Sequence, residues 1–182
     1  MKKVLISAFT PFNNKGNNYS SEVLEFIHSN EYEIDKVTLD VVYDRCFDEL
    51  KKHDLDSYDL IIALGEARMR NVLTVERVAK NISSCSLPDN SGALKKDEII
   101  DPALPDALTS GIDLGKLTSY ADVSDDAGKF VCNNMYFHLL KYDSKRTMFI
   151  HVPECENSVD NYKLYAKKIE SIVEILLSDK IT

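Results

Sequence analysis

A cysteine lies at the start of a helical pattern in the second half of the chain. From Val131 onward apolar residues recur every fourth position, which is a helical period. Asp125 and Asp126 precede this pattern and are expected to cap the free N–H groups of the helix. The partial positive charge at a helix N-terminus favours a thiolate, so Cys132 is a candidate nucleophile. Free cysteines also serve as small core residues, and this stretch alone leaves both interpretations open.

Two side chains that could assist such a nucleophile lie far from it in the sequence. His151 is near the C-terminal end of a predicted strand, 148–153, and ligands of open α/β sheets gather at such ends. A lone histidine there can also be purely structural. Glu76 lies in a predicted extended segment, 73–82, where Glu76 and Arg77 could equally form a solvated edge.

Two phenylalanines occupy a turn-rich loop, 8–18, that follows the first predicted strand. Phe9 and Phe12 either pack down on the core or form the wall of a substrate pocket. The other long irregular region, 88–110, contains several prolines, and a loop of that length is usually functional or mobile.

The elements that must position these residues alternate between strands and helices. The segment 58–64 is continuously apolar, which is typical of a central strand covered on both faces. We therefore expect a three-layer α/β/α sandwich around a mostly parallel, twisted sheet. Other strands are predicted at 3–7, 37–42 and 121–124. Helical segments are predicted after Ser20 or Ser21, at 45–52, at 114–120, and after Asn157 or Ser158. The last helix is expected to turn inward a stripe of Val159, Tyr162, Tyr165, Ile169, Ile172, Val173 and Leu176.

Length and composition limit the possible classes of protein. The 182 residues, of which 44% are hydrophobic, predict one domain spanning 1–182. A formal net charge of −8 argues against nucleic acid as a partner. No apolar run approaches a membrane span, and the N-terminus is better interpreted as a first strand than as a signal peptide. The four cysteines form no CxxC pair and suggest no disulfide framework, which favours the cytoplasm.

Five stretches, in the right order, resemble one family. Residues 8–12 (Ala-Phe-Thr-Pro-Phe), 76–81 (Glu-Arg-Val-Ala-Lys-Asn), 88–92 (Pro-Asp-Asn-Ser-Gly), 127–133 (Ala-Gly-Lys-Phe-Val-Cys-Asn) and 149–153 (Phe-Ile-His-Val-Pro) are similar to motifs of pyroglutamyl peptidase I. These proteins, also called pyrrolidone-carboxylate peptidases, form cysteine peptidase family C15. The resemblance covers nearly the whole chain and implies their phosphorylase/hydrolase-like fold.

The resemblance implies a catalytic triad of Cys132 as nucleophile, His151 as general base and acid, and Glu76 as the group that orients the imidazole. It implies cleavage of an N-terminal pyroglutamyl residue from small peptides through a thioester, without a metal or a cofactor. It also implies a homo-oligomer, either a dimer or a tetramer. The positions that match substrate-binding residues of the family are Phe9, Phe12, Leu87, Phe130 and Val131, together with Glu66, where some members carry a neutral residue such as Gln.

The chain departs from the family pattern at several places. Asn13 and Asn14 replace two glycines, which restricts a backbone that could approach the ligand. Ser86 lies where the family often has an arginine near the developing oxyanion, and the helix at 114–120 is shortened. A divergent hydrolase of another small amide or ester, or a binding protein without activity, therefore stays an alternative. A metal site is disfavoured, because His151 and Cys155 lack a second ligand pair and Pro153 lies between them.

Overall fold

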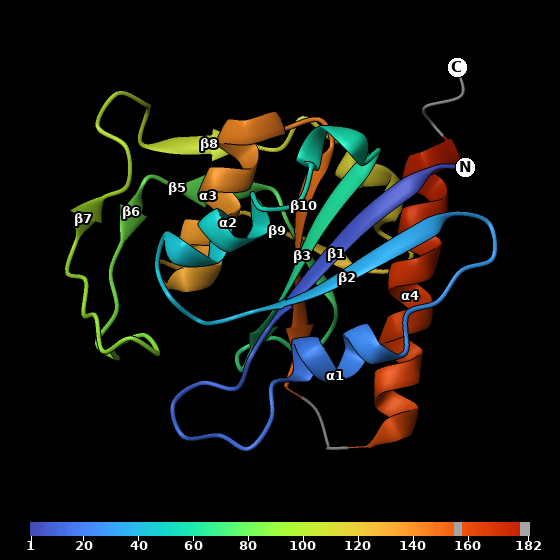
Figure 1. Cartoon of the computed structure of the whole chain (residues 1–182), viewed down its shortest axis with the longest axis horizontal. Helices are drawn as coiled ribbons and strands as arrows, with labels where there is room; N and C mark the ends of the chain where they lie inside the picture. Colours follow the sequence, from blue (N-terminus) through green and yellow to red (C-terminus); the bar gives the residue numbers. More distant parts are fainter. Residues whose placement is uncertain (155–157, 179–182) are drawn as a thin grey trace.

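The structure, a computed structural model, describes residues 1–154 and 158–178, and a six-stranded sheet runs through its centre (Figure 1). The strand order is β2-β1-β3-β10-β4-β9. Only the β10–β4 pair is antiparallel among the neighbouring strands of this sheet in the described residues. The mostly parallel sheet expected from the sequence is confirmed. Its strands are β1 (Lys3–Phe9), β2 (Glu33–Leu39), β3 (Leu60–Ala67), β4 (Thr74–Glu76), β9 (Asp122–Ser124) and β10 (Thr147–Pro153).

Helices cover both faces of this sheet, as expected for three layers. α1 (Tyr19–Glu25) and α4 (Val159–Ser178) lie on one face, and α2 (Arg45–Leu50) and α3 (Val131–Asp143) lie on the other (Figure 1). Successive strand residues alternate between these two layers. In β3, for example, Ile62 packs with the α1–α4 layer and Ile61 with the α2–α3 layer, and both are fully buried. This double burial explains why the central strands are continuously apolar.

Element boundaries differ from the sequence-based expectations at several ends. The strand expected at 37–42 is β2, which ends at Leu39, so that Val41 and Val42 pack beside α2. α1 is capped by Asn18 rather than by a serine, because the Asn18 side chain accepts a hydrogen bond from the Ser20 N–H.

The C-terminal helix mostly follows its predicted stripe. Ser158 Oγ accepts a hydrogen bond from the Asn161 N–H, which agrees with Ser158 as the cap, while Asn157 lies outside the described residues. Val159, expected to face inward, is instead 52% exposed because it begins the helix beyond the edge of the core. Tyr162 and Ile169 are buried as expected.

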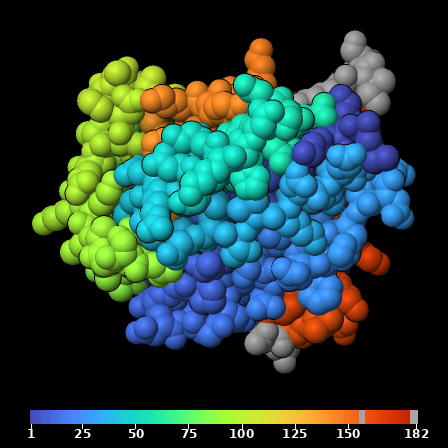
Figure 2. All heavy atoms as spheres, viewed as in Figure 1, coloured from blue at the N-terminus to red at the C-terminus, as the bar shows by residue number. Residues whose placement is uncertain are grey.

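The region expected to be irregular contains short strands. β5 (Val78–Lys80) pairs with β8 (Ala107–Thr109), and β6 (Ile82–Ser83) pairs with β7 (Glu98–Ile99), both antiparallel. Asn81 holds the connection, since its Nδ2 donates to the carbonyl oxygens of Asp101, Leu104 and Pro105. Figure 2 shows this yellow-green segment along one side of the molecule, next to the blue loop after β1, where Asn90 Nδ2 donates to the Pro11 carbonyl at 3.1 Å.

The segment 114–120 contains a single 3-10 turn, η2 (Leu114–Leu117), where helical turns were expected. A second 3-10 turn, η1 (Leu55–Ser57), leads into β3. η2 is followed directly by β9, which pairs with β4 and so carries the chain to the edge of the sheet just before α3.

Candidate active site

Asp125 and Asp126 do not cap the N-terminus of α3. α3 begins at Val131, and its N-cap residue Phe130 makes no side-chain capping bond. The prediction that Asp125 and Asp126 cap this helix is wrong. Asp125 pairs with Arg77, and Asp126 accepts from Lys80 and from the Gly128 N–H, because the turn at Gly128 separates both aspartates from the helix start.

Two asparagines fix the first turn of α3 and with it the position of Cys132. Asn133 Nδ2 donates to the carbonyl oxygens of Lys80 and Ile82, and its Oδ1 accepts from the Lys80 N–H at 2.8 Å. Asn134 Nδ2 donates to Asp44 Oδ1, and Asn134 Oδ1 accepts from the Asp44 N–H. Both asparagines are fully buried, so these bonds tie the helix start to β5, β6 and the start of α2.

Glu76 and His151 form a buried pair. His151 Nδ1 lies 2.7 Å from Glu76 Oε1, and the Glu76 side chain is fully buried while that of His151 is 7% exposed. Arg70 Nη2 lies 3.1 Å from the same carboxylate oxygen. The interpretation of Glu76 and Arg77 as a solvated edge is therefore wrong for Glu76, because β4 lies inside the sheet between β10 and β9.

Gly65 leaves space for the sulfur of Cys132 next to β3. Gly65 in β3 is paired in register with His151 in β10, and a Cβ atom at Gly65 would lie only 2.9 Å from Cys132 Sγ. The same Cβ would lie 2.7 Å from the ring of Phe149, which packs against His151 with ring centroids 4.9 Å apart. The missing side chain at Gly65 thus leaves space for the Cys132 sulfur beside the β3 residue that is paired with His151.

The surroundings of Cys132 favour the protonated form of its thiol. Burial, together with the charges of Glu76 and Glu66, raises the pKa of Cys132 to about 12. The expectation that the helix N-terminus favours a thiolate is not met, because loss of solvation outweighs the helix dipole. A thiol with so high a pKa needs a base to become a nucleophile, and within the described residues Glu76 contacts only Nδ1 of His151, so that Nε2 could act as that base.

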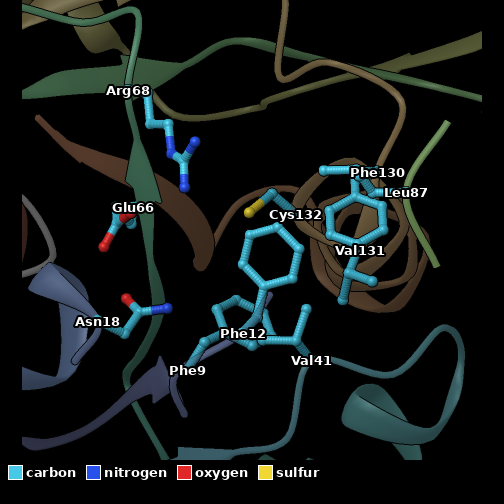
Figure 3. A pocket seen from close by; sticks show the side chains of 10 residues that line it. All are labelled: Phe9, Phe12, Asn18, Val41, Glu66, Arg68, Leu87, Phe130, Val131 and Cys132. Carbon is cyan, nitrogen blue, oxygen red and sulfur yellow. The ribbon is translucent and has the colours of Figure 1, made fainter. Parts of the chain in front are cut away.

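A pocket of about 180 Å³ opens beside Cys132 (Figure 3). Its walls are mostly apolar and come from the loop after β1, the start of α3 and the segment after β6. The lining residues are Phe9, Phe12, Asn18, Val41, Glu66, Arg68, Leu87, Phe130, Val131 and Cys132. The structure thus places all the predicted substrate-binding residues around one cavity with Cys132, and that they bind substrate stays a prediction.

The Glu66 carboxylate is bound by other residues of this chain. Glu66 Oε1 accepts from Lys15 Nζ at 2.5 Å, and Oε2 accepts from the Tyr19 N–H at 3.0 Å. Both oxygens are therefore engaged within the chain, one by the loop after β1 and the other by the first residue of α1. In the same loop Asn13 and Asn14 have φ values of 55° and 57°, a left-handed conformation that asparagine tolerates well in place of glycine.

Several residues at this site were missed in the sequence analysis. Gly65, Arg68 and Arg70 all lie at or just beyond the carboxyl end of β3, where ligands of such sheets gather, and that position was the available signal. Arg68 lines the pocket, whereas Ser86, the position where an arginine was expected, is not among the lining residues. Asn18 and Val41 were missed because their neighbours in space are distant in sequence.

The described residues offer no cluster suited to a metal ion and no membrane-spanning helix. Across residues 1–154 and 158–178, no three His, Cys, Asp or Glu side chains are grouped closely enough to hold a metal ion. Cys155, which the sequence suggested as a weak metal-ligand candidate, lies outside these residues. Of the helices in the described part of the chain, none has the length and apolar character needed to cross a membrane.

Comparison with known proteins gives a consistent result. The family model described as pyroglutamyl peptidase matches residues 2–175. The pyrrolidone-carboxylate peptidase of Thermosipho africanus is 30% identical over 191 residues, covering 96% of this chain and 93% of its own. That of Erwinia tasmaniensis is 35% identical over 176 residues, covering 89% and 83%. The crystal structure of pyrrolidone carboxyl peptidase from Pyrococcus furiosus superposes with a TM-score of 0.86 at 25% identity, covering 97% of this chain and 99% of that one.

Proposed function

The chain belongs to the pyroglutamyl peptidase family, and we propose that it is a cysteine peptidase that removes an N-terminal pyroglutamyl residue from peptides. The observations that support this proposal are the buried Glu76–His151 pair, 2.7 Å between Oε1 and Nδ1, and the place of Cys132 in the lining of an apolar pocket. A nucleophile, a base and a group that orients the base are the parts that acyl transfer requires.

The pocket suits a small uncharged ring. In Figure 3 the rings of Phe12 and Phe130 form its walls, and their centroids lie 5.3 Å apart. The five-membered lactam of pyroglutamate would lie among these apolar walls, with its carbonyl carbon against Cys132 Sγ. An unblocked N-terminal glutamate or glutamine would bring a charged ammonium into the same space, and its desolvation is unfavourable.

Acylation then proceeds through the triad. Cys132 Sγ attacks the carbonyl carbon of the pyroglutamyl residue while its proton passes to His151 Nε2. The Glu76 carboxylate stabilises the resulting imidazolium, and the free N–H groups in the first turn of α3 stabilise the oxyanion. When the tetrahedral intermediate collapses, the imidazolium gives its proton to the departing amine and the C–N bond breaks, which leaves a thioester on Cys132.

Deacylation reverses the same proton path. A water molecule gives a proton to His151 Nε2 and attacks the thioester carbon. The second tetrahedral intermediate expels the sulfur, which takes its proton back from the imidazolium, and pyroglutamic acid leaves. The high pKa of the Cys132 thiol in the free protein agrees with this cycle, since the proton leaves the sulfur only during attack.

The first prediction tests this function directly. The wild-type protein is expected to release the fluorophore from pyroglutamyl-7-amino-4-methylcoumarin, and Cys132→Ala is expected to lower kcat by at least ~10³-fold because the nucleophile is gone. Cys46→Ala is the matched control, since Cys46 is a buried thiol of α2 outside the pocket. The proposal fails if the folded wild-type protein is inactive or if Cys132→Ala keeps its activity.

We further propose a cytoplasmic location and a homo-oligomeric state, either a dimer or a tetramer. A catalytic thiol needs a reducing compartment to escape oxidation, which supports the cytoplasm. Exposed apolar side chains on the β6–β8 segment, such as Leu94 and Ile99, support self-association. Cell fractionation and sedimentation equilibrium measure the two properties, and an extracytoplasmic or strictly monomeric protein would contradict them.

A further inference from the structure

We propose that Arg68 makes this protein selective for leaving groups that carry a carboxylate next to the scissile bond, above all pyroglutamyl dipeptides with a free C-terminus. The inference rests on the proposed function, because it concerns which amine leaves from the same site. It goes beyond that function by assigning a specificity-determining residue on the leaving-group side of the pocket.

The charges around the pocket single out Arg68. Glu66 also lines the pocket, but Lys15 neutralises it at 2.5 Å and its side chain is only 8% exposed. In Figure 3 the Glu66 carboxylate points away from Cys132, toward the start of α1. Among the described residues that line the pocket, Arg68 is the only one with a positive charge, and the remaining walls are apolar apart from Asn18 and the cysteine.

The guanidinium of Arg68 is placed to receive an anion. Its side chain is 53% exposed, and in Figure 3 the guanidinium extends from the end of β3 toward the sulfur of Cys132. Within the described part of the chain its sole partner is Glu154, at 3.4 Å from Nε, so the two terminal nitrogens have no protein acceptor there. Glu154 is itself shared, because its other oxygen lies 3.0 Å from Lys15 Nζ.

The direction of the substrate brings its leaving group to this guanidinium. The ring lies between the aromatic walls, so the chain beyond the scissile bond must leave the pocket past Cys132, on the side where Arg68 extends. In a dipeptide the free α-carboxylate is two bonds from the departing nitrogen. The unengaged terminal nitrogens of Arg68 can bind that carboxylate in the paired geometry that guanidinium groups favour.

The test compares two substrates that differ only in charge, pyroglutamyl-alanine and pyroglutamyl-alanine amide. The wild-type protein is expected to show a kcat/KM roughly ten- to hundred-fold higher for the free acid, the range of a charge-assisted hydrogen bond. Arg68→Gln should abolish this preference by lowering kcat/KM for the acid roughly ten- to hundred-fold more than for the amide. Arg68→Glu should reverse the preference.

The matched control is Arg45→Gln, which removes the same charge from an exposed side chain on α2 outside the pocket and should preserve the preference. The inference is overturned if the wild-type protein hydrolyses both substrates equally well. It is also overturned if Arg68→Gln slows both equally, since Arg68 would then act on the reacting carbonyl. If neither substrate nor the coumarin amide is hydrolysed, the proposed function itself has failed, which is a distinguishable result.

Discussion

At the scale of single residues, the surroundings of Cys132 set how its proton is held. The sulfur is desolvated by its neighbours, and two carboxylates, those of Glu76 and Glu66, oppose the negative charge of a thiolate. Of these two carboxylates, that of Glu76 is paired with His151. Glu66 raises the pKa of the thiol from outside this pair, and its charge is offset by Lys15 at 2.5 Å.

A second prediction follows for Glu66→Gln. Removing this carboxylate lowers the pKa of Cys132 and leaves the positive charge of Lys15 nearby, so more thiolate is present at pH 7. We expect alkylation of Cys132 by iodoacetamide at pH 7 to become several-fold faster, measured by mass spectrometry of the labelled peptide. Glu22→Gln, on the surface of α1, should leave the rate unchanged, and an equal or slower rate in Glu66→Gln would contradict the argument.

A third prediction concerns Gly65. Alanine there would bring a Cβ to 2.9 Å from Cys132 Sγ and 2.7 Å from the Phe149 ring, both closer than van der Waals contact allows. Phe149 is fully buried and cannot withdraw cheaply, so Gly65→Ala should displace the sulfur and lower kcat by at least ~10²-fold. Gly16→Ala is the control, because nothing lies within 4 Å of a Cβ at Gly16. Unchanged kinetics in Gly65→Ala would mean that the sulfur is not held there.

At the scale of elements, the site depends on how α3 is held against its neighbours. The Asp44 carboxylate, just before α2, contacts three side chains. These are Asn134 and His138 of α3, at 2.9 and 3.1 Å, and Lys95 of the segment between β6 and β8, at 2.8 Å. The hydrogen bond from His138, with those from Lys95 and Asn134, holds the pKa of Asp44 well below its usual range. The Asp44 carboxylate thus links α3 to the segment that carries the pocket residue Leu87.

The fourth prediction is the effect of acid on this link. A carboxyl whose pKa is lowered on folding stabilises the native state above its unfolded pKa of about 3.9, and that contribution is lost as the pH falls below this value. Asp44→Asn should therefore lower the free energy of urea unfolding at pH 7 and make its decrease between pH 5 and 3 less steep than in the wild-type protein. Asp48→Asn, an exposed neighbour on α2, should follow the wild-type curve. A parallel decrease in Asp44→Asn and the wild-type protein would argue against the link.

At the scale of the whole molecule, the sheet joins segments from both ends of the chain. β1, near the N-terminus, and β10, from residue 147 onward, both pair with β3, and α4 packs against α1 across the same face (Figure 1). A part of the chain could not unfold without exposing strands from the rest. This arrangement supports the single domain expected from the length.

The fifth prediction is accordingly one cooperative unfolding transition. The chain has nine tyrosines and no tryptophan, so tyrosine fluorescence is a useful probe of unfolding. It should follow the same urea curve as far-UV circular dichroism. Coincident midpoints and slopes would support one domain spanning 1–182. Two separated transitions, or midpoints that differ between the probes, would contradict it.

Much of this architecture could be predicted from the sequence, because the signals for it are local. The continuous apolar run in β3 and the helical period from Val131 each require only neighbouring residues to be compared. The family and its activity also depend on short motifs, and the family is confirmed by the match over residues 2–175. The residues of the candidate triad were named in this way, and their catalytic roles remain predictions.

The tertiary structure alone decided how those residues meet. No local pattern indicates that β4 runs antiparallel to β10, that Gly65 lies opposite His151, or that Asp125 and Asp126 bind Arg77 and Lys80 instead of capping α3. Burial of Glu76, the raised pKa of Cys132 and the entry of Arg68 into the pocket likewise depend on groups brought together from distant parts of the chain. Periodicity reflects which face of an element is buried, whereas the strength of a charge or the reactivity of a thiol depends on every atom that replaces water around it.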